Sequence, residues 1–521
     1  MAAARPAIAA VPERRAARPR VLLAATAVVV VLLALPPAFL LIEAYGAGVS
    51  TVWHLIFREL TATLLRNSIE LGAVVTPLSA VIGTAAAFFV ERTELRGRAV
   101  WTTLLIMPLA IPDFVVAFGW SSLTNWIEGF RGAVVVMTLA LYPLVYLPVA
   151  ASLRNSDPGQ EEVARSLGVG RLATFRRITL GQARGAILGG CLLVVLVLLA
   201  EFGAFEIIGF RTFSTEIYIE FNVSFDVPAA AALSLALVAL CVLLLLGETF
   251  LHGRGRVARA GPLTQRFGRP HRLGAWSVAV IAGLAALVAL SVGVPLYAAL
   301  HWTFGRGGAV VDWSTLVNAF WHTMLYSAPA ALLATAMAVP VALLVVRYPG
   351  RGNRILERST YLVLAMPSMI AFSLSYFTGR YVNGFAYQSA PLLMLAYAVL
   401  FFPFALVAVR ASAARVPAAL EEVGRSLGRP RWVVLTRITL PLLAPGLAAA
   451  FCLVFLSSVI ELTTTLILIP TGSQTLSTEF WSFQQNLAYS QAAPYALAMI
   501  VVAAIPAFIL GRFFSRTAVS V

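Results

Sequence analysis

The chain has 521 residues, of which 60% are hydrophobic and only 12% are charged. Soluble globular domains carry about a quarter charged residues, so this composition excludes an ordinary soluble protein. Apolar runs of 20 or more residues recur along the sequence. Each is long enough to cross the ~30 Å hydrocarbon core of a bilayer as a helix. We expect an all-α polytopic membrane protein, because a transmembrane β-barrel would show short alternating segments instead.

All 38 basic residues are arginine, and the formal net charge is +15. In a membrane protein such an excess reflects the positive-inside bias of short loops, so we expect no nucleic acid partner. The missing lysine excludes a standard phosphate-binding P-loop, whose lysine contacts the nucleotide phosphates. We therefore expect no cofactor in this chain.

The apolar runs predict twelve membrane spans, six on each side of a basic linker. In the first half they cover residues 21–44, 67–90, 99–120, 132–153, 185–209 and 228–251. In the second half they cover residues 274–300, 322–346, 359–377, 389–411, 443–469 and 493–514. Placing the N-terminus in the cytoplasm puts 32 arginines on the cytoplasmic side and 6 on the other. This split predicts cytoplasmic N- and C-termini and an even number of spans.

The predicted organisation has two membrane domains of similar size. A basic tail at 1–20 precedes the first domain at 21–251, and the linker at 252–273 leads to the second domain at 274–521. Each domain contains one unusually long loop on the predicted cytoplasmic side. These loops cover about 154–184 and about 412–442.

The two long loops repeat one another. Residues 161–180 and 421–440 are identical at twelve of twenty positions without a gap. The same spacing pairs Glu201 with Glu461, inside the following span of each half. Because each half has an even number of spans, both halves sit the same way up, which excludes inverted-repeat architectures.

Each loop is far longer than a connection between two spans needs. Its pattern predicts a helix, a Gly turn at Gly168 or Gly428 and a second helix. Acidic residues open the first helix, where they complement the helix dipole. The loop is either a membrane anchor or a docking element. Lipid accepts almost any apolar residue, so spans change freely, whereas a loop that stays alike in both halves favours docking to two equal partners or a symmetric dimer.

The loop pattern is similar to the cytoplasmic EAA loop of ATP-binding-cassette (ABC) importer permeases, E-A-A, three residues, G, nine residues, I-x-L-P. The matching residues are Glu162, Ala164, Gly168, Ile178 and Leu180 in the first copy, and Glu422, Gly424, Gly428, Ile438, Leu440 and Pro441 in the second. Val163 and Val423 replace the first Ala of the pattern. Gly424 replaces the second Ala, and Gly181 replaces the final Pro of the first copy.

The resemblance implies a transport subunit and not an enzyme. In this family each loop forms a coupling helix that fits a groove on one ATP-binding subunit, and closure of those subunits rocks the two membrane halves. ATP and Mg are then expected on a partner ATPase dimer, and an extracytoplasmic binding protein delivers the cargo. The resemblance places the chain in a bacterial inner membrane.

The cargo resemblance is to the ferric iron importer group, through residues 201–218 and 461–481. Permeases for thiamine, polyamines or phosphonate share the general plan and remain alternatives. A secondary transporter of the 6+6 type is a second alternative. Its usual basic, Gly-rich motif between spans two and three is missing from ERTELRGR at 91–98.

Two acidic residues, Glu201 and Glu461, are predicted inside spans, where charge is costly and normally faces a protein interior or a cavity. They line a path for a cationic cargo, or they make structural hydrogen bonds to neighbouring helices. The outer segments 211–227 and 470–492 are candidates for docking of a binding protein, with simple connection of spans as the alternative. No Cys/His cluster has the spacing of a metal site.

Overall fold

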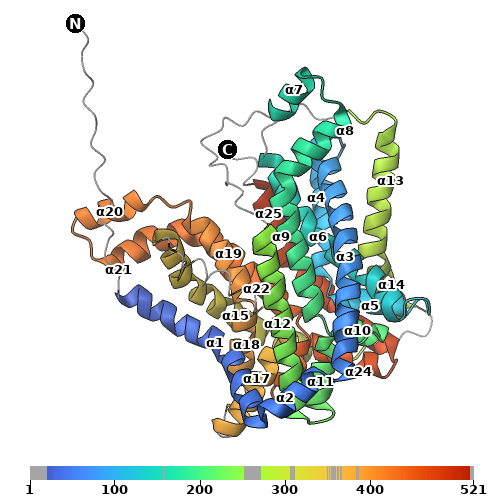
Figure 1. Cartoon of the computed structure of the whole chain (residues 1–521), viewed down its shortest axis with the longest axis vertical. Coiled ribbons are helices and arrows are strands. Elements are labelled where there is room, and N and C mark those ends of the chain that lie inside the picture. Colours follow the sequence, from blue (N-terminus) through green and yellow to red (C-terminus); the bar gives the residue numbers. More distant parts are fainter. Residues whose placement is uncertain are drawn as a thin grey trace.

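A computed structural model describes residues 20–155, 159–251, 272–305, 311–348, 350, 352–353, 360, 363, 367–382 and 386–516. Across these ranges the chain is helical almost throughout (Figure 1). The first half contains α1 (Arg20–Ala47), α2 (Val49–Ile56), α3 (Glu59–Arg92), α4 (Arg98–Ile106), η1 (Met107–Ala110), α5 (Asp113–Ser121), α6 (Gly129–Asn155), α7 (Gly159–Ser166), α8 (Arg171–Thr174), η2 (Phe175–Thr179), α9 (Leu180–Ala200), α10 (Gly203–Ile208), α11 (Phe213–Asn222) and α12 (Val227–Leu251).

The second half repeats much of this order. It contains α13 (Trp276–Val288), η3 (Ala289–Gly293), α14 (Val294–Phe304), α15 (Trp313–Arg347), α17 (Pro367–Tyr381), α18 (Ala390–Leu400), α19 (Phe402–Ala413), α20 (Ala418–Ser426), α21 (Arg431–Val434), η4 (Leu435–Thr439), α22 (Leu440–Val459), α23 (Thr463–Leu468), α24 (Leu476–Gln485) and α25 (Tyr489–Arg516).

The described residues confirm an all-α polytopic membrane protein. Nine helices are long and apolar enough to cross a membrane, and the number rises to eleven if each of two bent helix pairs is one span. The predicted span at 359–377 lies partly outside the described residues, and α17 begins only at Pro367. The total of twelve spans therefore stays a prediction.

Several predicted spans are broken, and hydropathy did not reveal the breaks. The third span bends by 89° between Ala110 and Asp113. Pro108 lies just before this bend and Pro112 lies within it. Proline removes a backbone donor and disrupts the helix around it. The span predicted at 389–411 bends by 54° between α18 and α19. The spans predicted at 185–209 and 443–469 each end early, with a short separate helix after the break.

Each half is built around the same group of three helices. In the first half α3, α6 and α9 pack on one another, and in the second half α15, α19 and α22 do the same. Small residues allow the close approach that helix packing in membranes relies on. A Cβ on Gly83 of α3 would lie 2.8 Å from the carbonyl oxygen of Tyr142 on α6. These three-helix groups carry the two repeated loops.

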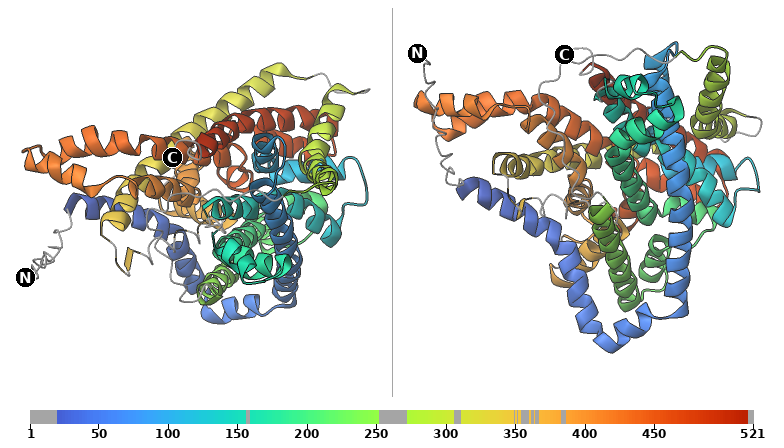
Figure 2. Two further views of the ribbon diagram at one scale, coloured as in Figure 1. Left: turned by 90° about the horizontal axis from the view of Figure 1, so that it is seen from above. Right: turned by 45° about the horizontal axis from the view of Figure 1, so that its top comes forward.

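The first span of each half packs against the other half. Helix α1 contacts α15 and α17 of the second half, and α14 contacts α5 of the first half. Figure 1 shows α1 on the left beside second-half helices and α13 on the right beside first-half helices, and Figure 2 shows the same exchange from two further directions. This exchange links the two halves, so a movement of one half must displace a helix of the other.

Candidate functional site

The repeated loop forms the predicted helix, Gly turn and helix in both halves. Helix α7 ends at Ser166 and helix α20 ends at Ser426. Gly168 and Gly428 follow with φ of 80° and 76°, in the left-handed region where glycine avoids the Cβ penalty. Among the residues that the structure describes, no atom lies within 4 Å of an added Cβ at either position. Backbone conformation, not lack of space, is therefore what requires glycine here.

A π-helical turn follows the Gly turn in both copies. It covers η2 (Phe175–Thr179) and η4 (Leu435–Thr439), and it contains Ile178 and Ile438. Such turns are rare and concentrate at functional sites. Leu180 and Leu440 then begin α9 and α22, so Gly181 and Pro441 both stand second in a helix. The two copies therefore differ just after the π-turn, where the backbone returns to the α-helical hydrogen-bond pattern.

One face of each first helix packs against this π-turn. Ala164 is buried in α7, and Gly424 is buried at the same place in α20. A Cβ on Gly424 would lie 2.9 Å from Cδ1 of Ile438 and 3.2 Å from Cγ2 of Val434. The loop pattern thus needs a small residue here because the two helices touch.

Next to this buried face, each first helix and the residue that follows it expose apolar side chains. Val163 is 59% exposed and Val423 is 55% exposed. Leu167 and Leu427 are 77% and 75% exposed. Glu422 is also exposed, whereas the side chain of Glu162 lies outside the part that the structure describes. Both copies therefore present the same pair of uncovered apolar side chains, one helical turn apart.

An arginine from the end of the second span holds each first helix. Arg347 donates from Nη2 to Oε1 of Glu421 at 2.8 Å and from Nη1 to the carbonyl of Val416 at 3.0 Å. In the first half, Nη2 of Arg92 lies 3.6 Å from Oε1 of Glu161, which also accepts from Thr179 Oγ1 at 2.9 Å. Sequence reasoning missed these pairs. The available signal was an Arg ending the second span of both halves.

These contacts place loops that were predicted on one side of the membrane next to one another. Arg92 and Arg347 belong to the loops after the second spans, and their partners belong to the repeated loops. At the other end, Arg58 Nη2 lies 2.8 Å from Oε1 of Glu220, and both residues were predicted on the outer side. The contacts agree with the predicted alternation of loops.

Glu201 and Glu461 occupy equivalent breaks after α9 and α22. Oε1 of Glu201 accepts from the backbone N–H of Ala204 at 2.7 Å, and Oε1 of Glu461 accepts from that of Thr464 at 2.8 Å. Each carboxylate therefore caps the short helix that follows it, as acidic side chains do at helix N-termini. Of the two interpretations left open, the structure shows a local hydrogen bond, and no contact here tests a role in transport.

The two breaks meet where the halves pack together. A Cβ on Gly203 would lie 2.7 Å from Cδ2 of Leu462 and 2.9 Å from Cβ of Phe114. The carboxylates of Asp113 and Glu461 lie close enough to Glu201 to interact with it electrostatically. Asp113 begins α5 directly after the 89° bend. The structure thus adds a third carboxylate to the two that the sequence singled out.

The outer segments also repeat. Helices α11 and α24 begin with the same capping box, formed by Thr212 with Thr215 and by Thr475 with Thr478. Burial raises the pKa of the Glu216 carboxyl above its usual range, and burial also raises the pKa of Glu479. Both glutamates follow their capping box by one residue.

His301 and His322 contact an aromatic ring and a backbone carbonyl, respectively. His301 stacks on Tyr297, with ring centroids 5.7 Å apart. His322 Nδ1 lies 3.1 Å from the carbonyl oxygen of Gln474. Within the described residues, no group of three or more His, Cys, Asp or Glu side chains is arranged to hold a metal ion.

Comparison with known families settles the class of protein. A family model described as binding-protein-dependent transport system inner membrane component matches residues 79–256 and 330–518. The chain belongs to this family. The match covers most of the chain, and each matched region contains one repeated loop. This permease is a transport component and not an enzyme, and its family excludes the 6+6 secondary transporter alternative.

Curated relatives of the permease include several iron transport proteins. The Fe(3+)-transport system permease protein FbpB 2 of Haemophilus influenzae is 36% identical over 485 residues, which cover 92% of this chain and 96% of that protein. The ferric transport system permease protein FbpB of Actinobacillus pleuropneumoniae is 24% identical over 84% of this chain and 69% of its own length.

Shorter relatives match part of the permease. The sulfate transport system permease protein CysW of Synechocystis is 28% identical over 241 residues, which make up 42% of this chain but 86% of that protein. Most of a single-unit permease therefore corresponds to less than half of this chain.

Proposed function

We propose that this permease carries ferric iron across the inner membrane as part of an ABC importer. Support comes from the FbpB 2 relative, which matches nearly the whole of both chains and is named for Fe(3+) transport. The relatives named for sulfate match less than half of this chain. Thiamine, polyamine and phosphonate remain the cargo alternatives to be tested.

The proposed engine is a dimer of ATPase subunits that binds α7 and α20 on the cytoplasmic side. The observation that carries this proposal is the matched pair of exposed apolar side chains, Val163 with Leu167 and Val423 with Leu427. Uncovered apolar groups beside polar ones are typical of a protein interaction surface. Two equal surfaces suit a partner with two equal subunits.

The orientation and the site of ATP binding belong to the same proposal. The distribution of arginine supports cytoplasmic N- and C-termini, because positive loops stay on that side. ATP and Mg would bind the partner subunits, since this chain has no lysine for a P-loop. Glu162, Glu422, Gly168 and Gly428 then belong to the docking elements.

For the cargo path we propose the region around Glu201, Glu461 and Asp113. Ferric iron is a hard cation, and such cations prefer oxygen ligands. Carboxylates at the meeting point of the two halves would favour a positive cargo at the place where rocking of the halves opens a passage. The capping hydrogen bonds use one oxygen of each glutamate.

On the outer side we propose that the turns after α11 and α24 receive the binding protein. Phe225 and Leu487 follow these helices with φ of 55° and 56°. Both side chains are strongly exposed. A large non-glycine residue in the left-handed region is uncommon, and such strain concentrates at functional positions. Phe225 and Leu487 therefore present exposed apolar side chains at equivalent positions, where a partner protein could bind them.

Reconstitution tests the cargo and the energy source together. Proteoliposomes would contain the permease and its ATPase subunits, with the solute-binding protein loaded with ferric iron on the outer side. We expect iron to accumulate inside only when ATP is present on the cytoplasmic side, and excess thiamine, spermidine or phosphonate not to compete. Uptake without ATP, or uptake of another cargo in place of iron, would refute the proposal.

A further inference from the structure

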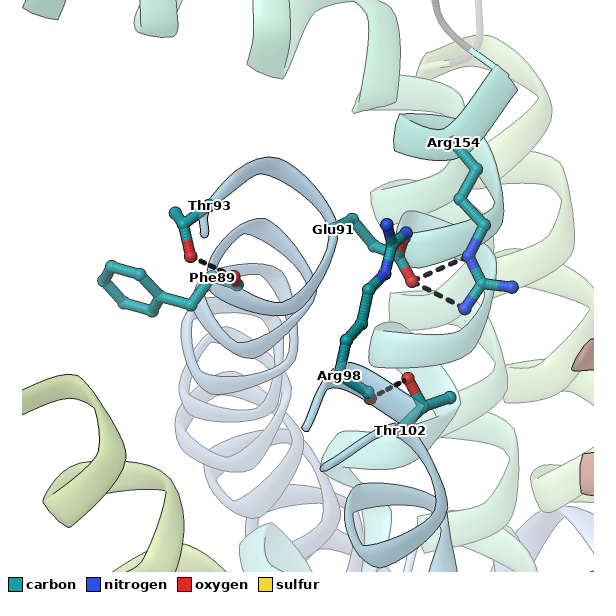
Figure 3. Close-up of polar contacts among 6 residues, drawn as sticks. All are labelled: Phe89, Glu91, Thr93, Arg98, Thr102 and Arg154. Atoms are coloured by element: carbon teal, nitrogen blue, oxygen red, sulfur yellow. Dashed lines mark hydrogen bonds and ion pairs between the residues drawn. The ribbon is translucent and has the colours of Figure 1, made fainter. Parts of the chain in front are cut away.

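A buried ion cluster joins three helices of the first half. The side chain of Glu91, in the last turn of α3, has 0% exposed surface. Arg154, near the end of α6, places two nitrogens on its Oε1, Nε at 2.7 Å and Nη2 at 2.6 Å. Arg98, the first residue of α4, pairs with the other carboxylate oxygen. Figure 3 shows the two guanidinium groups converging on this one carboxylate.

The cluster lies beside the pair that holds α7. Arg92 follows Glu91 directly and pairs with Glu161. Successive residues of an α-helix point about 100° apart, so one turn of α3 can hold two different elements. Glu91 holds the end of α6 just before the coupling loop, and Arg92 holds α7 within it. The end of α3 therefore makes one ion pair with the residues just before the repeated loop and another with the first helix of that loop.

The second half keeps the Arg–Glu pair but has other residue types at the three positions that form the cluster. When Arg92 is aligned with Arg347, Val346 stands at the position of Glu91. In the same alignment the sequence RGR at 96–98 matches RGN at 351–353, so Asn353 stands at the position of Arg98. The spacing of the loop repeat places Ala414 opposite Arg154. All three matching residues are uncharged. Asn353 is buried and donates to the carbonyls of Leu344 and Tyr348, a neutral link at the end of α15.

The shared helices therefore form in the second half without a Glu–Arg–Arg set at these three positions. The second half builds the same three-helix group and the same loop with Val346, Asn353 and Ala414. A buried carboxylate is costly unless well paired, so the cluster is not explained as a general aid to folding. Its specific effect is to fix the positions of α3, α4 and α6 relative to one another.

We propose that Glu91 is a positioning residue for coupling ATP hydrolysis to transport, and that it makes the first coupling loop move as one body with α3, α4 and α6. The second coupling loop is joined to its half through Arg347 and transmits motion by that link. The two loops bind equal ATPase subunits, but the first loop transmits their movement through the Glu91 cluster and the second loop does so through Arg347. This inference rests on the proposed function, because it presumes that α7 receives an ATPase subunit.

The test converts the first-half residues into those of the second half. The triple variant Glu91→Val, Arg98→Asn, Arg154→Ala is reconstituted as the full complex, and ATP hydrolysed per iron transported is measured beside that of the wild type. We expect the variant to bind the ATPase subunits normally and the ratio to rise about 2- to 30-fold, the range by which residues along a coupling network act. Glu91→Gln, which keeps the side-chain shape, is measured in parallel and should raise the ratio in the same direction.

The outcomes separate this inference from the proposed function. A normal ratio in both variants, with the ATPase bound, would overturn the role of Glu91 and leave docking intact. If the wild-type permease fails to bind the ATPase subunits, the proposed function itself is wrong. If the triple variant does not insert, Glu91→Gln decides alone. Val346→Ala at the matching second-half position is the control and should leave the ratio unchanged.

Discussion

Arg347 and Glu421 form an ion pair, with Nη2 and Oε1 2.8 Å apart, that joins the end of α15 to the start of α20. Arg92 and Glu161 form the corresponding pair in the first half, at 3.6 Å. The sequence repeat showed that the two repeated loops are alike. The ion pairs show that each loop is attached in the same way to the second span of its half. Movement of a loop can therefore be transmitted to a membrane-spanning helix.

Breaking the second-half pair should weaken this attachment. Arg347→Ala removes the partner of Glu421 and should destabilise the packing of α20 against the end of α15 by about 1.5–3 kcal/mol, the range for hydrogen bonds to charged groups. Transport should fall while insertion in the membrane stays normal. The measurement is ATP-dependent iron uptake by proteoliposomes.

Charge exchange supplies the control for this pair. The double variant Arg347→Glu, Glu421→Arg should recover part of the uptake that either single variant loses, because the two charges can pair again. Single-variant losses that simply add in the double variant would contradict a direct interaction between the two residues.

The turn glycines should be sensitive to any side chain. Gly168→Ala or Gly428→Ala places a Cβ in the left-handed region, which costs about 1–2 kcal/mol for an L-residue. Within the described part of the chain the added methyl would meet no atom within 4 Å, so the expected strain is in the backbone. We expect reduced uptake with normal insertion. Gly181→Ala is the matched control, because Gly181 is helical and equally open, and it should be neutral or slightly stabilising.

The buried face of α20 at Gly424 should tolerate one methyl group but not a larger side chain. In Gly424→Ala the new Cβ meets the terminal Cδ1 of Ile438, which can move, and the first half already carries Ala164 at this position. Uptake should stay near the wild-type level. Gly424→Leu should separate α20 from η4 and abolish uptake, and normal activity of this variant would contradict the packing described for the loop.

Much of this site could be predicted from the sequence. The loop repeat, the Gly turn and the small residue at 164 and 424 are local features, so they are visible as letters at fixed spacing. The partners Arg92 and Arg347 lie 69 and 74 residues from Glu161 and Glu421, and their role depends on helix packing that spacing does not reveal.

The broken spans escaped prediction for a different reason. Hydropathy measures the composition of a run and not its direction, so the 89° bend before Asp113 looked like one continuous span. Likewise, Glu201 and Glu461 could be placed inside apolar runs, but their capping of the next short helix depends on a backbone break that composition does not show.

The charge of Glu201 and Glu461 can be removed while the hydrogen bonds to the following short helices are kept. In Glu201→Gln with Glu461→Gln, each amide oxygen can still accept from the backbone N–H of Ala204 or Thr464, while the negative charge is lost. If the cargo path uses these charges, iron uptake falls at least about tenfold, which corresponds to ~1.4 kcal/mol at the transport barrier. ATPase binding should not change. Uptake at the wild-type rate would remove both residues from the path.

Photo-crosslinking is the most direct test of the proposal that α7 and α20 bind the ATPase subunits. A photoreactive amino acid would replace Leu167 in one variant and Leu427 in another, since both side chains are exposed on matching faces. Irradiation of the assembled complex should join each variant to one ATPase subunit, with similar yield at the two positions, as seen by the mass of the adduct. Adducts with lipid alone, or an ATPase adduct at neither position, would contradict the claim that α7 and α20 are the docking elements.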